Sequence, residues 1–304
     1  MRPIFSEQGI EKGVIVKVLV SGASGFIGKQ VVQFLQGLGQ WRILTSGRNE
    51  EKLKELGADY IVYDINQEHH HCYDRLGRPE VLIHLAWEGL PQYQESFHLD
   101  RNLINHYRFL QSMVAQGLPS LTVTGTCYEY GLQNGCLREE MPANPTTCYG
   151  LAKDVLRRRL AALQKEHPFR LRWLRLFFMH GPGQPARTLM GQVDQALAAG
   201  QESFDMSSGE QLRDYLPAPE VAALIAKVAL QTRHDGIFNV CSGQPISVRR
   251  LVEEHIAAKR GRLRLNLGVY PYPDHEPLAF WGDPDRLRLA VAAFEEERNH
   301  AAIP

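Results

Sequence analysis

Tyr149 and Lys153 are the two side chains in this sequence whose types and spacing best suit proton transfer. They are four residues apart, so in a helix they share one face and can act on a single substrate group. A free tyrosine has a pKa of about 10 and is a poor base at neutral pH, but a neighbouring ammonium favours the phenolate. The spacing therefore predicts that Tyr149 exchanges a proton with a carbonyl or an alcohol, assisted by Lys153.

Thr126 is the candidate partner of this pair. It closes the run TVTGT at residues 122–126, which has the pattern of a strand end. A hydroxyl at the carboxyl end of a parallel strand can hydrogen-bond a substrate oxygen as charge develops on it. The alternative is a β-branched residue that only ends a strand. We predict Thr126, Tyr149 and Lys153 as the catalytic residues.

A glycine-rich turn between residues 21 and 29 provides a second chemical signal. It lies directly between the strand pattern of residues 14–20 and an amphipathic run at residues 31–38. Glycine permits a tight turn, a close approach to a pyrophosphate and close packing of the following helix, whose N-terminus carries partial positive charge. The alternative is a purely structural turn. The predicted cofactor contacts on this turn are Gly22, Ser24, Gly25, Phe26, Ile27 and Gly28.

The end of the second strand pattern, at residues 41–45, bears on the choice of nicotinamide cofactor. An NAD site usually places Asp or Glu there, whereas Ser46 and Arg48 stand there in this chain. Both could bind a 2′-phosphate, so we predict a preference for NADP(H), with NAD(H) as the alternative. Arg48 could instead begin a solvated loop. Asp64 and Ile65 are placed to meet the adenine ring, unless Asp64 only caps a turn.

The elements that must position these residues alternate between strand and helix. Apolar, β-branched strand patterns lie at residues 14–20, 41–45, 60–63, 81–85, 121–124 and 171–178. Helical patterns lie between them at residues 31–38, 50–56, 101–115 and 149–163. This order predicts an α/β fold with a parallel sheet that is covered on both faces. After residue 180 the alternation fades, which indicates a smaller and irregular second lobe.

Composition and charge exclude several classes of function. The chain has 304 residues, and Lys+Arg and Asp+Glu both count 34, so a nucleic-acid partner is not expected. No apolar run of about 18 residues occurs, so no membrane span is expected. Residues 1–13 lack the apolar stretch of a signal peptide and are interpreted as a tail of a cytoplasmic protein. The five scattered cysteines and the run HHHC at residues 69–72 lack the spacing of a metal site, so we predict none.

Together these residues resemble the extended branch of the short-chain dehydrogenase/reductase superfamily, which includes sugar-nucleotide epimerases, dehydratases and reductases. The resemblance spans residues 16 to about 290 and rests on GASGFIG, VLIHLAW, TGTCYEYG, Tyr149 with Lys153, RLFFMHGPGQ, GEQLRDY, FNVCSGQPISV and WGDPDR. It implies a doubly wound, parallel-sheet Rossmann domain with a smaller, discontinuous substrate-binding lobe, a nucleotide-sugar substrate and a homodimer joined through the helices near 101–115 and 149–163. The implied domains are residues 14–178 plus about 212–243, and residues about 179–211 plus 244–298.

The resemblance also implies further contacts. Those to the cofactor are Leu85, Ala86, Trp87, Asn102 and Phe177, besides Tyr149 and Lys153. Those to the substrate are Trp87, Thr126, Cys127, Tyr128, Phe178, His180 and Arg213. Phe178 and His180 replace an Asn and a Tyr that are usual in the family, so substrate placement is expected to differ. His84 lies inside a buried strand pattern and is interpreted as a core histidine.

Departures from individual subfamilies narrow the chemistry. Dehydratases of this family follow the threonine with Asp-Glu, where Cys127 and Tyr128 stand here. Epimerising reductases carry a cysteine and a histidine where Tyr128 and Gly183 stand, and 4-epimerases carry an acid at the end of the second strand.

Simple carbonyl reduction remains, and residues 84–93, 122–131 and 270–283 resemble reductases of the dTDP-6-deoxy-L-talose type. The hypothesis is an NAD(P)H-dependent reductase of a nucleotide-linked 4-keto-6-deoxy sugar, such as dTDP-4-keto-6-deoxyhexose. The alternatives are a sugar-nucleotide epimerase with retained NAD and a non-catalytic, NADPH-sensing regulator.

Overall fold

Residues 16–272, 274 and 276–301 are described by the computed structural model, and the tail predicted at residues 1–13 lies outside them. At the centre of the described residues is a seven-stranded sheet in which all neighbouring strands are parallel. In spatial order its strands are β11 (Gly236–Val240), β7 (Arg170–Leu176), β5 (Ser120–Thr126), β4 (Val81–His84), β1 (Lys17–Ser21), β2 (Arg42–Gly47) and β3 (Asp59–Val62). From β1 the chain adds strands outward in both directions, so the prediction of a doubly wound α/β sheet is confirmed.

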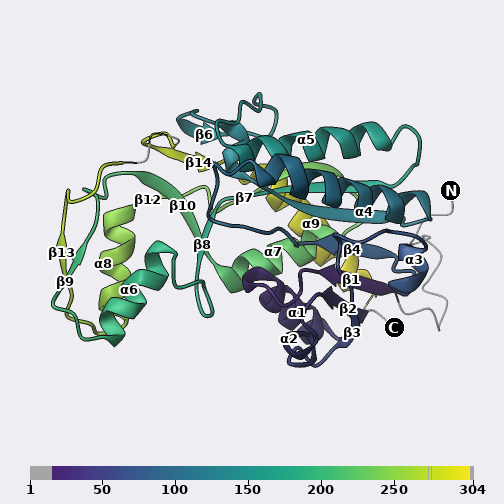
Figure 1. Cartoon of the computed structure of the whole chain (residues 1–304), viewed down its shortest axis with the longest axis horizontal. Coiled ribbons are helices and arrows are strands. Elements are labelled where there is room, and N and C mark those ends of the chain that lie inside the picture. The colour runs from purple at the N-terminus through teal and green to yellow at the C-terminus, as the bar shows by residue number, and fades with distance from the viewer. Residues whose placement is uncertain (1–15, 273, 275, 302–304) are drawn as a thin grey trace.

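Helices cover both faces of this sheet (Figure 1). One face carries α1 (Phe26–Leu38), α2 (Glu50–Lys54), α7 (Ala218–Leu230) and α9 (Asp285–Ala301), and the other carries α3 (Cys72–Arg75), α4 (Ile104–Ala115) and α5 (Cys148–Leu163). Side chains of a strand point alternately to its two faces, so Val18 and Val20 join the core under α1 and α7, whereas Leu19 joins the core under α4 and α5. Strands buried on both sides explain the continuous apolar runs of the sequence.

Three elements differ from the expected patterns. Helix α1 begins at Phe26, five residues before the predicted amphipathic run, because Gly25 serves as its N-cap. A π-helical turn, η1 (His98–Leu103), precedes α4 where one continuous helix was predicted. The predicted strand at residues 171–178 ends at Leu176, and Phe177 packs into a separate core cluster at the junction of the two lobes. The residues predicted as one strand therefore contribute to two sheets.

The remaining strands build the smaller lobe and its junction, at the left of Figure 1. A three-stranded sheet has the order β12 (Pro245–Ser247), β10 (Leu212–Pro217), β8 (Phe178–His180), and the two-stranded sheets pair β13 (Arg264–Asn266) with β9 (Ser203–Asp205) and β14 (Phe280–Gly282) with β6 (Gly135–Leu137). Helices α6 (Leu189–Ala198) and α8 (Val248–Ala258) enclose a third core cluster there. The domain boundaries themselves stay a prediction.

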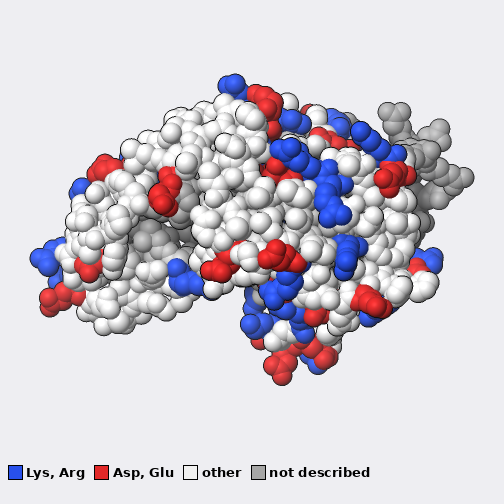
Figure 2. Space-filling model, turned by 45° about the horizontal axis from the view of Figure 1, so that its top comes forward, with Lys and Arg blue, Asp and Glu red and all other residues white. Residues whose placement is uncertain are grey.

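The surface and the helices bear on possible partners. Within residues 16–301, apart from the two undescribed positions, no helix is long and apolar enough to span a membrane. Basic and acidic side chains are interspersed over the face that Figure 2 shows. The described histidines, cysteines and carboxylates also include no group of three that could hold a metal ion.

Candidate active site

The glycine turn after β1 is held tightly by the ends of two neighbouring strands. The N–H of Gly22 donates to the carbonyl of Ser46 at 3.0 Å, and Gly22 has a φ of +74°. A Cβ on Gly22 would lie 2.6 Å from the nitrogen of Ala86, and one on Gly28 would lie 2.3 Å from the carbonyl oxygen of Gly22. Both positions therefore require glycine for steric reasons.

The N-terminus of α1 is open toward solvent beside this turn. Its N-cap, Gly25, is exposed, provides no side-chain cap, and is followed by no acidic residue in the first turn. The first N–H groups of α1 thus keep their partial positive charge, and a Cβ on Gly25 would meet only the oxygen of Gly22 at 3.2 Å. Half-buried Ser24, Phe26 and Ile27 surround the opening. This arrangement fits the pyrophosphate of a dinucleotide.

The two residues predicted to recognise a 2′-phosphate have different surroundings. Ser46 is buried, and its carbonyl anchors the glycine turn. Arg48 is 58% exposed, and its Nη1 lies 2.6 Å from Oε1 of Glu88, just after β4. Glu88 was not predicted, because its proximity to Arg48 depends on how the strands before these residues are arranged in the sheet.

Asp64, predicted to meet the adenine, accepts hydrogen bonds from the backbone N–H and the side-chain amide of Asn66, both at 2.9 Å. That is the turn-capping arrangement named above as the alternative. Ile65 is half-buried against the core under α4. These contacts do not require an adenine ring, and the adenine role of Asp64 stays a prediction.

The other predicted cofactor residues are spread along the carboxyl edge of the sheet. The N–H of Leu85 continues the pairing of β4 with β1, which brings Ala86 against Gly22. Asn102 is buried, and its side-chain amide donates to the carbonyl of Glu88 at 3.1 Å. Phe177 lies in the junction cluster with Cys127 and Phe280.

Tyr149 and Lys153 lie together at the start of α5, as their spacing predicted. The helix begins at Cys148 because the Thr147 hydroxyl caps it, accepting from the N–H of Gly150 at 3.0 Å. The Lys153 ammonium donates to the carbonyl of Thr124 on β5 at 2.8 Å. It also lies 3.9 Å from the ring centroid of Trp87 and 5.9 Å from that of Tyr149. Trp87 thus covers the ammonium on the side of the sheet edge.

Burial dominates the protonation of both groups. It lowers the pKa of Lys153 to about 7, against the charge of Glu129, which favours the ammonium. Burial also raises the pKa of Tyr149 well above its usual value, reinforced by Tyr93, Glu129 and Cys127 and opposed by a hydrogen bond with Thr126. Tyr149 therefore carries its proton at neutral pH, so the shift toward the phenolate that was expected from Lys153 does not dominate.

Thr126 is fixed by a capping box at the end of β5. Its Oγ1 accepts from the N–H of Tyr128 at 3.3 Å, at the start of the short helix η2 (Cys127–Tyr130). Its own N–H donates to Oε1 of Glu129 at 2.9 Å. Glu129 was missed by the sequence analysis, although a Thr followed three residues later by Glu is a known helix-start signal.

Predicted substrate residues meet a carboxylate from the C-terminal half of the chain. The hydroxyl of Tyr128 donates to Oε1 of Glu276 at 2.5 Å, and Nη2 of Arg213 donates to Oε2 at 2.7 Å. Arg213 is buried, and its guanidinium lies 4.5 Å from the ring centroid of Phe280. Glu276 was also missed, because it is 148 residues from Tyr128.

Aromatic rings form a wall between Tyr149 and the smaller lobe. Ring centroids of Tyr93 and Tyr149 are 5.7 Å apart, those of Tyr93 and Tyr128 4.8 Å, and those of Phe178 and Tyr215 5.2 Å. We call Tyr93, Tyr128, Phe178 and Tyr215 the aromatic wall.

Two further predicted substrate residues adjoin this wall. The ring of His180 lies 6.3 Å from that of Tyr215, and burial lowers the pKa of His180. Cys127 is buried, which raises the pKa of its thiol, so it is held as an unreactive thiol rather than a thiolate.

His84 is a core histidine, as predicted. Its Nδ1 lies 2.6 Å from Oγ of Ser21, and its Nε2 lies 2.7 Å from Nδ1 of His106. Burial lowers the pKa of His84 to about 3 and holds that of His106 well below its usual value, so both rings are neutral. The His106 ring packs against Trp87 with centroids 4.5 Å apart, which supports the indole from below.

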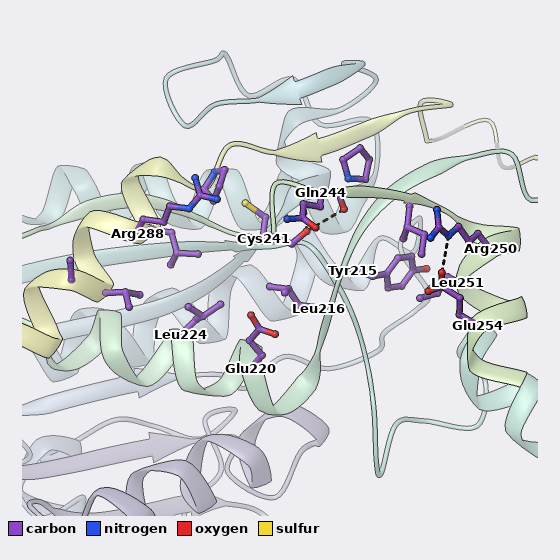
Figure 3. Close-up of a pocket in the computed structure, with 17 residues that line it drawn as sticks. Tyr215, Leu216, Glu220, Leu224, Cys241, Gln244, Arg250, Leu251, Glu254 and Arg288 are labelled. Atoms are coloured by element: carbon purple, nitrogen blue, oxygen red, sulfur yellow. Dashed lines mark hydrogen bonds and ion pairs between the residues drawn. The ribbon is translucent and has the colours of Figure 1, made fainter. Parts of the chain in front are cut away.

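A cavity of about 900 Å³ lies elsewhere, between α7, α8 and α9 (Figure 3). Apolar Leu224 and Leu251 line it together with charged Glu220, Arg250 and Arg288. Thr126, Tyr149 and Lys153 are not among its lining residues. Its arginine at residue 250 is already bonded to Glu254 at 2.7 Å. The chemistry assigned here therefore belongs to the strand edge, and not to this cavity.

Comparisons with known proteins identify the family of this chain. A sequence model described as the NAD dependent epimerase/dehydratase family matches residues 18–241. The chain is 32% identical over 273 residues to dTDP-6-deoxy-L-talose 4-dehydrogenase (NAD(+)) of Aggregatibacter actinomycetemcomitans, covering 88% of this chain and 99% of that protein.

Two solved structures share the fold. MoeE5 in complex with UDP-glucuronic acid and NAD has a TM-score of 0.77 and 23% identity, covering 93% of this chain and 99% of that one. A UDP-glucose-4-epimerase from Stenotrophomonas maltophila with bound NAD and formylated UDP-arabinopyranose has a TM-score of 0.79 and 20% identity, covering 92% of each chain.

Proposed function

The chain belongs to the NAD dependent epimerase/dehydratase family, and from that premise we propose that it is an NAD(P)H-dependent reductase of a nucleotide-linked 4-keto-6-deoxy sugar. The main support for this proposal is that Thr126, Tyr149 and Lys153 lie together at the carboxyl edge of the sheet and that Tyr149 is protonated at neutral pH. A relative that is 32% identical is named as a dehydrogenase of a dTDP-6-deoxy sugar.

The proposed reaction assigns one role to each side chain. The glycine turn would hold the pyrophosphate of the reduced nicotinamide cofactor, and that cofactor would supply hydride to the keto carbon. Tyr149 donates its proton to the keto oxygen, and the Thr126 hydroxyl orients that oxygen. Lys153 places positive charge next to the phenolate that is left, and Trp87 shields the ammonium from water.

Carbonyl reduction is favoured over water elimination because the η2 turn after Thr126 presents no carboxylate to the substrate. The carboxylate of Glu129 is fully buried and accepts from Thr126, Trp173 and Arg175, so it does not face a substrate. Tyr128, the residue before Glu129 on η2, carries a hydroxyl that donates a hydrogen bond to Glu276. An acid and a base for elimination are thus missing from the positions where dehydratases of this family carry them.

The aromatic wall supports a 6-deoxy sugar. Apolar ring surface from Tyr93 and Tyr128 lies beside Tyr149 and continues to Phe178, and such a surface suits a methyl group better than a hydroxymethyl or carboxylate group. A nucleotide sugar that reaches Tyr149 with its C4 carbonyl would place its methyl group against this wall.

For the cofactor we propose a preference for NADPH over NADH, which is finer than the nicotinamide use that the family shows. Arg48 follows the carboxyl end of β2 and is 58% exposed, and a 2′-phosphate could compete with Glu88 for its guanidinium. The Aggregatibacter relative is named for NAD(+), so this preference is the point at which the two proteins are expected to differ.

A paired turnover assay tests the proposed function. Purified protein is mixed with enzymatically prepared dTDP-4-keto-6-deoxyhexoses and either NADPH or NADH, and loss of reduced cofactor is followed with analysis of the sugar product. We expect stoichiometric cofactor consumption and a 6-deoxyhexose product, faster with NADPH. Sugar epimers formed with no added cofactor would identify an epimerase instead. Cofactor binding without conversion of dTDP-, GDP-, UDP- or ADP-linked keto sugars would support a regulator.

A further inference from the structure

A fully buried carboxylate, Glu129, lies directly behind the catalytic threonine and has no role in the reaction proposed above. Its Oε1 accepts from the N–H of Thr126 at 2.9 Å and from the indole N–H of Trp173 at 2.8 Å. Its Oε2 accepts from Nε of Arg175 at 2.8 Å. A buried charge with this many partners is costly to assemble, so its surroundings indicate what it does.

We propose that Glu129 is the positioning residue of this active site, holding Thr126 in place and supplying the negative charge that the buried Lys153 ammonium faces. The inference rests on the proposed reductase function for its kinetic consequences. Its structural content, a carboxylate that compensates Lys153, stands independently of the substrate.

Helix α5 presents one face to Glu129. Tyr149, Lys153 and Arg157 follow one another at intervals of four residues, so they form one stripe along that helix. Arg157, one turn beyond Lys153, has its Nε 3.9 Å from Oε2 of Glu129. The same stripe thus has a proton donor at one end and the Glu129 carboxylate beside the other.

Two arginines, Arg175 and Arg157, lie beside the Glu129 carboxylate. Arg175 on β7 is bonded to it and fully buried. Arg157 is shared with Asp154, to which its Nη2 donates at 2.6 Å, so part of its charge is compensated elsewhere. The charge of Glu129 opposes the effect of burial on the pKa of Lys153.

Several other groups also face Lys153. They are His84 on β4, His106 on α4, His98 on η1, the phenol of Tyr149 and the ring of Trp87. Burial lowers the pKa of each of the three histidines, and the nearby ammonium lowers it further, so they are neutral and cannot supply negative charge. Loss of the Glu129 charge would therefore leave the ammonium with neutral partners, the carbonyl of Thr124 and the Trp87 ring.

Glu129→Gln is the variant that tests this role, because the amide oxygen can still accept from Thr126 and Trp173 while the charge is lost. Its readout is the ¹³C shift of the Lys153 side chain in protein labelled with [ε-¹³C]lysine, assigned by loss of its signal in Lys153→Met. We expect the titration midpoint of Lys153 to fall by about one pH unit or more in Glu129→Gln. Glu129→Asp keeps the charge and is expected to retain most of the wild-type midpoint.

The kinetic readout is the pH profile of kcat/KM for reduction. The limb at which activity falls as pH rises is expected to move to lower pH in Glu129→Gln and to be restored in Glu129→Asp. The matched control is Glu140→Gln, which removes an exposed carboxylate that is paired with Arg138, and it is expected to leave both readouts unchanged. Should Glu129→Gln fail to fold, the double variant Glu129→Gln with Arg175→Gln is measured in its place. It removes both charges of the Glu129–Arg175 ion pair, and the titration midpoint of Lys153 is again expected to fall.

An unmoved Lys153 midpoint in a folded Glu129→Gln protein would overturn the proposal, even if turnover fell. A shifted midpoint would support it, whether or not any keto sugar is reduced. Failure of the proposed function is separate, since it would appear as absent turnover in the wild-type protein with an intact Lys153 titration.

Discussion

At the scale of single residues, the site is governed by burial more than by exposed charge. Lys153 and Tyr149 are 1% and 7% exposed, so removing water favours their neutral forms. The protein opposes this at Lys153 with the Trp87 ring and the Glu129 carboxylate. At Tyr149 neighbouring groups reinforce the effect of burial on the pKa, and the phenol keeps the proton that the proposed carbonyl reduction requires.

The first residue-scale prediction concerns Tyr149→Phe, which removes only the phenolic hydroxyl. We expect kcat/KM for reduction to fall by about 10²-fold or more, because the keto oxygen loses its proton donor. Cofactor affinity, measured by quenching of protein fluorescence, is expected to stay within about threefold of wild type. Near-wild-type turnover would show that another group delivers the proton.

The second residue-scale prediction concerns Arg48 and its partner. Arg48→Ala is expected to weaken NADPH binding by about 10-fold or more, because a charge-assisted contact to the 2′-phosphate is lost, and to change NADH binding little. Glu88→Gln, which frees Arg48 from a contact of 2.6 Å, is expected to strengthen NADPH binding. Binding titrations with both cofactors check this, and equal losses for NADPH and NADH in Arg48→Ala would contradict it.

At the scale of elements, the site is assembled where strands end. The carboxyl ends of β1, β4 and β5 bring the glycine turn, Trp87 and Thr126 to one edge of the sheet, and α5 crosses that edge with Tyr149 and Lys153. The contact of Ser21, His84 and His106 ties β1, β4 and α4 together beneath it. Small displacements of any of these elements would move the floor of the site.

This buried histidine pair predicts how stability depends on pH. Both rings are neutral in the folded protein and take up protons when it unfolds at a pH below about 6.5. Their contribution is complete above that pH and is lost as pH falls toward the folded pKa, which is about 3 for His84. Each histidine adds a slope of up to about 1.4 kcal/mol per pH unit to the free energy of unfolding.

Urea unfolding between pH 5 and 6.5 measures this slope. His106→Leu is expected to reduce it by up to about 1.4 kcal/mol per pH unit, whatever its effect on stability at neutral pH. His70→Gln replaces a histidine whose side chain is 85% exposed and serves as the control. An unchanged slope in His106→Leu would mean that His106 is not held neutral by the fold.

At the scale of the whole molecule, two lobes meet along the carboxyl edge of the large sheet (Figure 1). The junction cluster and the pairing of β14 with β6 connect them, and Glu276 reaches across to Tyr128. The helices on the far side of the large sheet leave apolar side chains exposed, among them Ile104 on α4 and Leu151 on α5. These are the helices through which a homodimer is expected from the family resemblance.

The whole-molecule prediction is therefore a dimer joined through α4 and α5. Leu151 is 41% exposed, and Leu151→Glu would place a charge in the expected interface, so we expect it to give a monomer of 34.4 kDa. Leu289→Glu alters a leucine of α9, which is 60% exposed on the opposite face, and is expected to leave the dimer intact. Light scattering coupled to size exclusion measures both masses. A wild-type monomer, or a dimer that only Leu289→Glu dissociates, would contradict the prediction.

Much of this protein follows from the sequence alone, because local patterns have local physical causes. Strands buried on both faces are rich in apolar and β-branched residues, so six of the seven strands of the large sheet and four of its helices were readable from the sequence. The turn at Gly22 and Gly28 permits no side chain, and the four-residue spacing of Tyr149 and Lys153 places them on one helical face. These features depend on neighbours within a few residues.

Only the tertiary structure decided the remainder, because it depends on residues brought together from distant segments. Glu88 beside Arg48 and Glu276 between Tyr128 and Arg213 are contacts that no spacing along the chain announces. The end of β7 at Leu176, after which the residues predicted as one strand continue into the smaller lobe, depends on how the strands pair. Burial itself, which sets the protonation of Tyr149 and Lys153, exists only once the two sides of the site have closed around them.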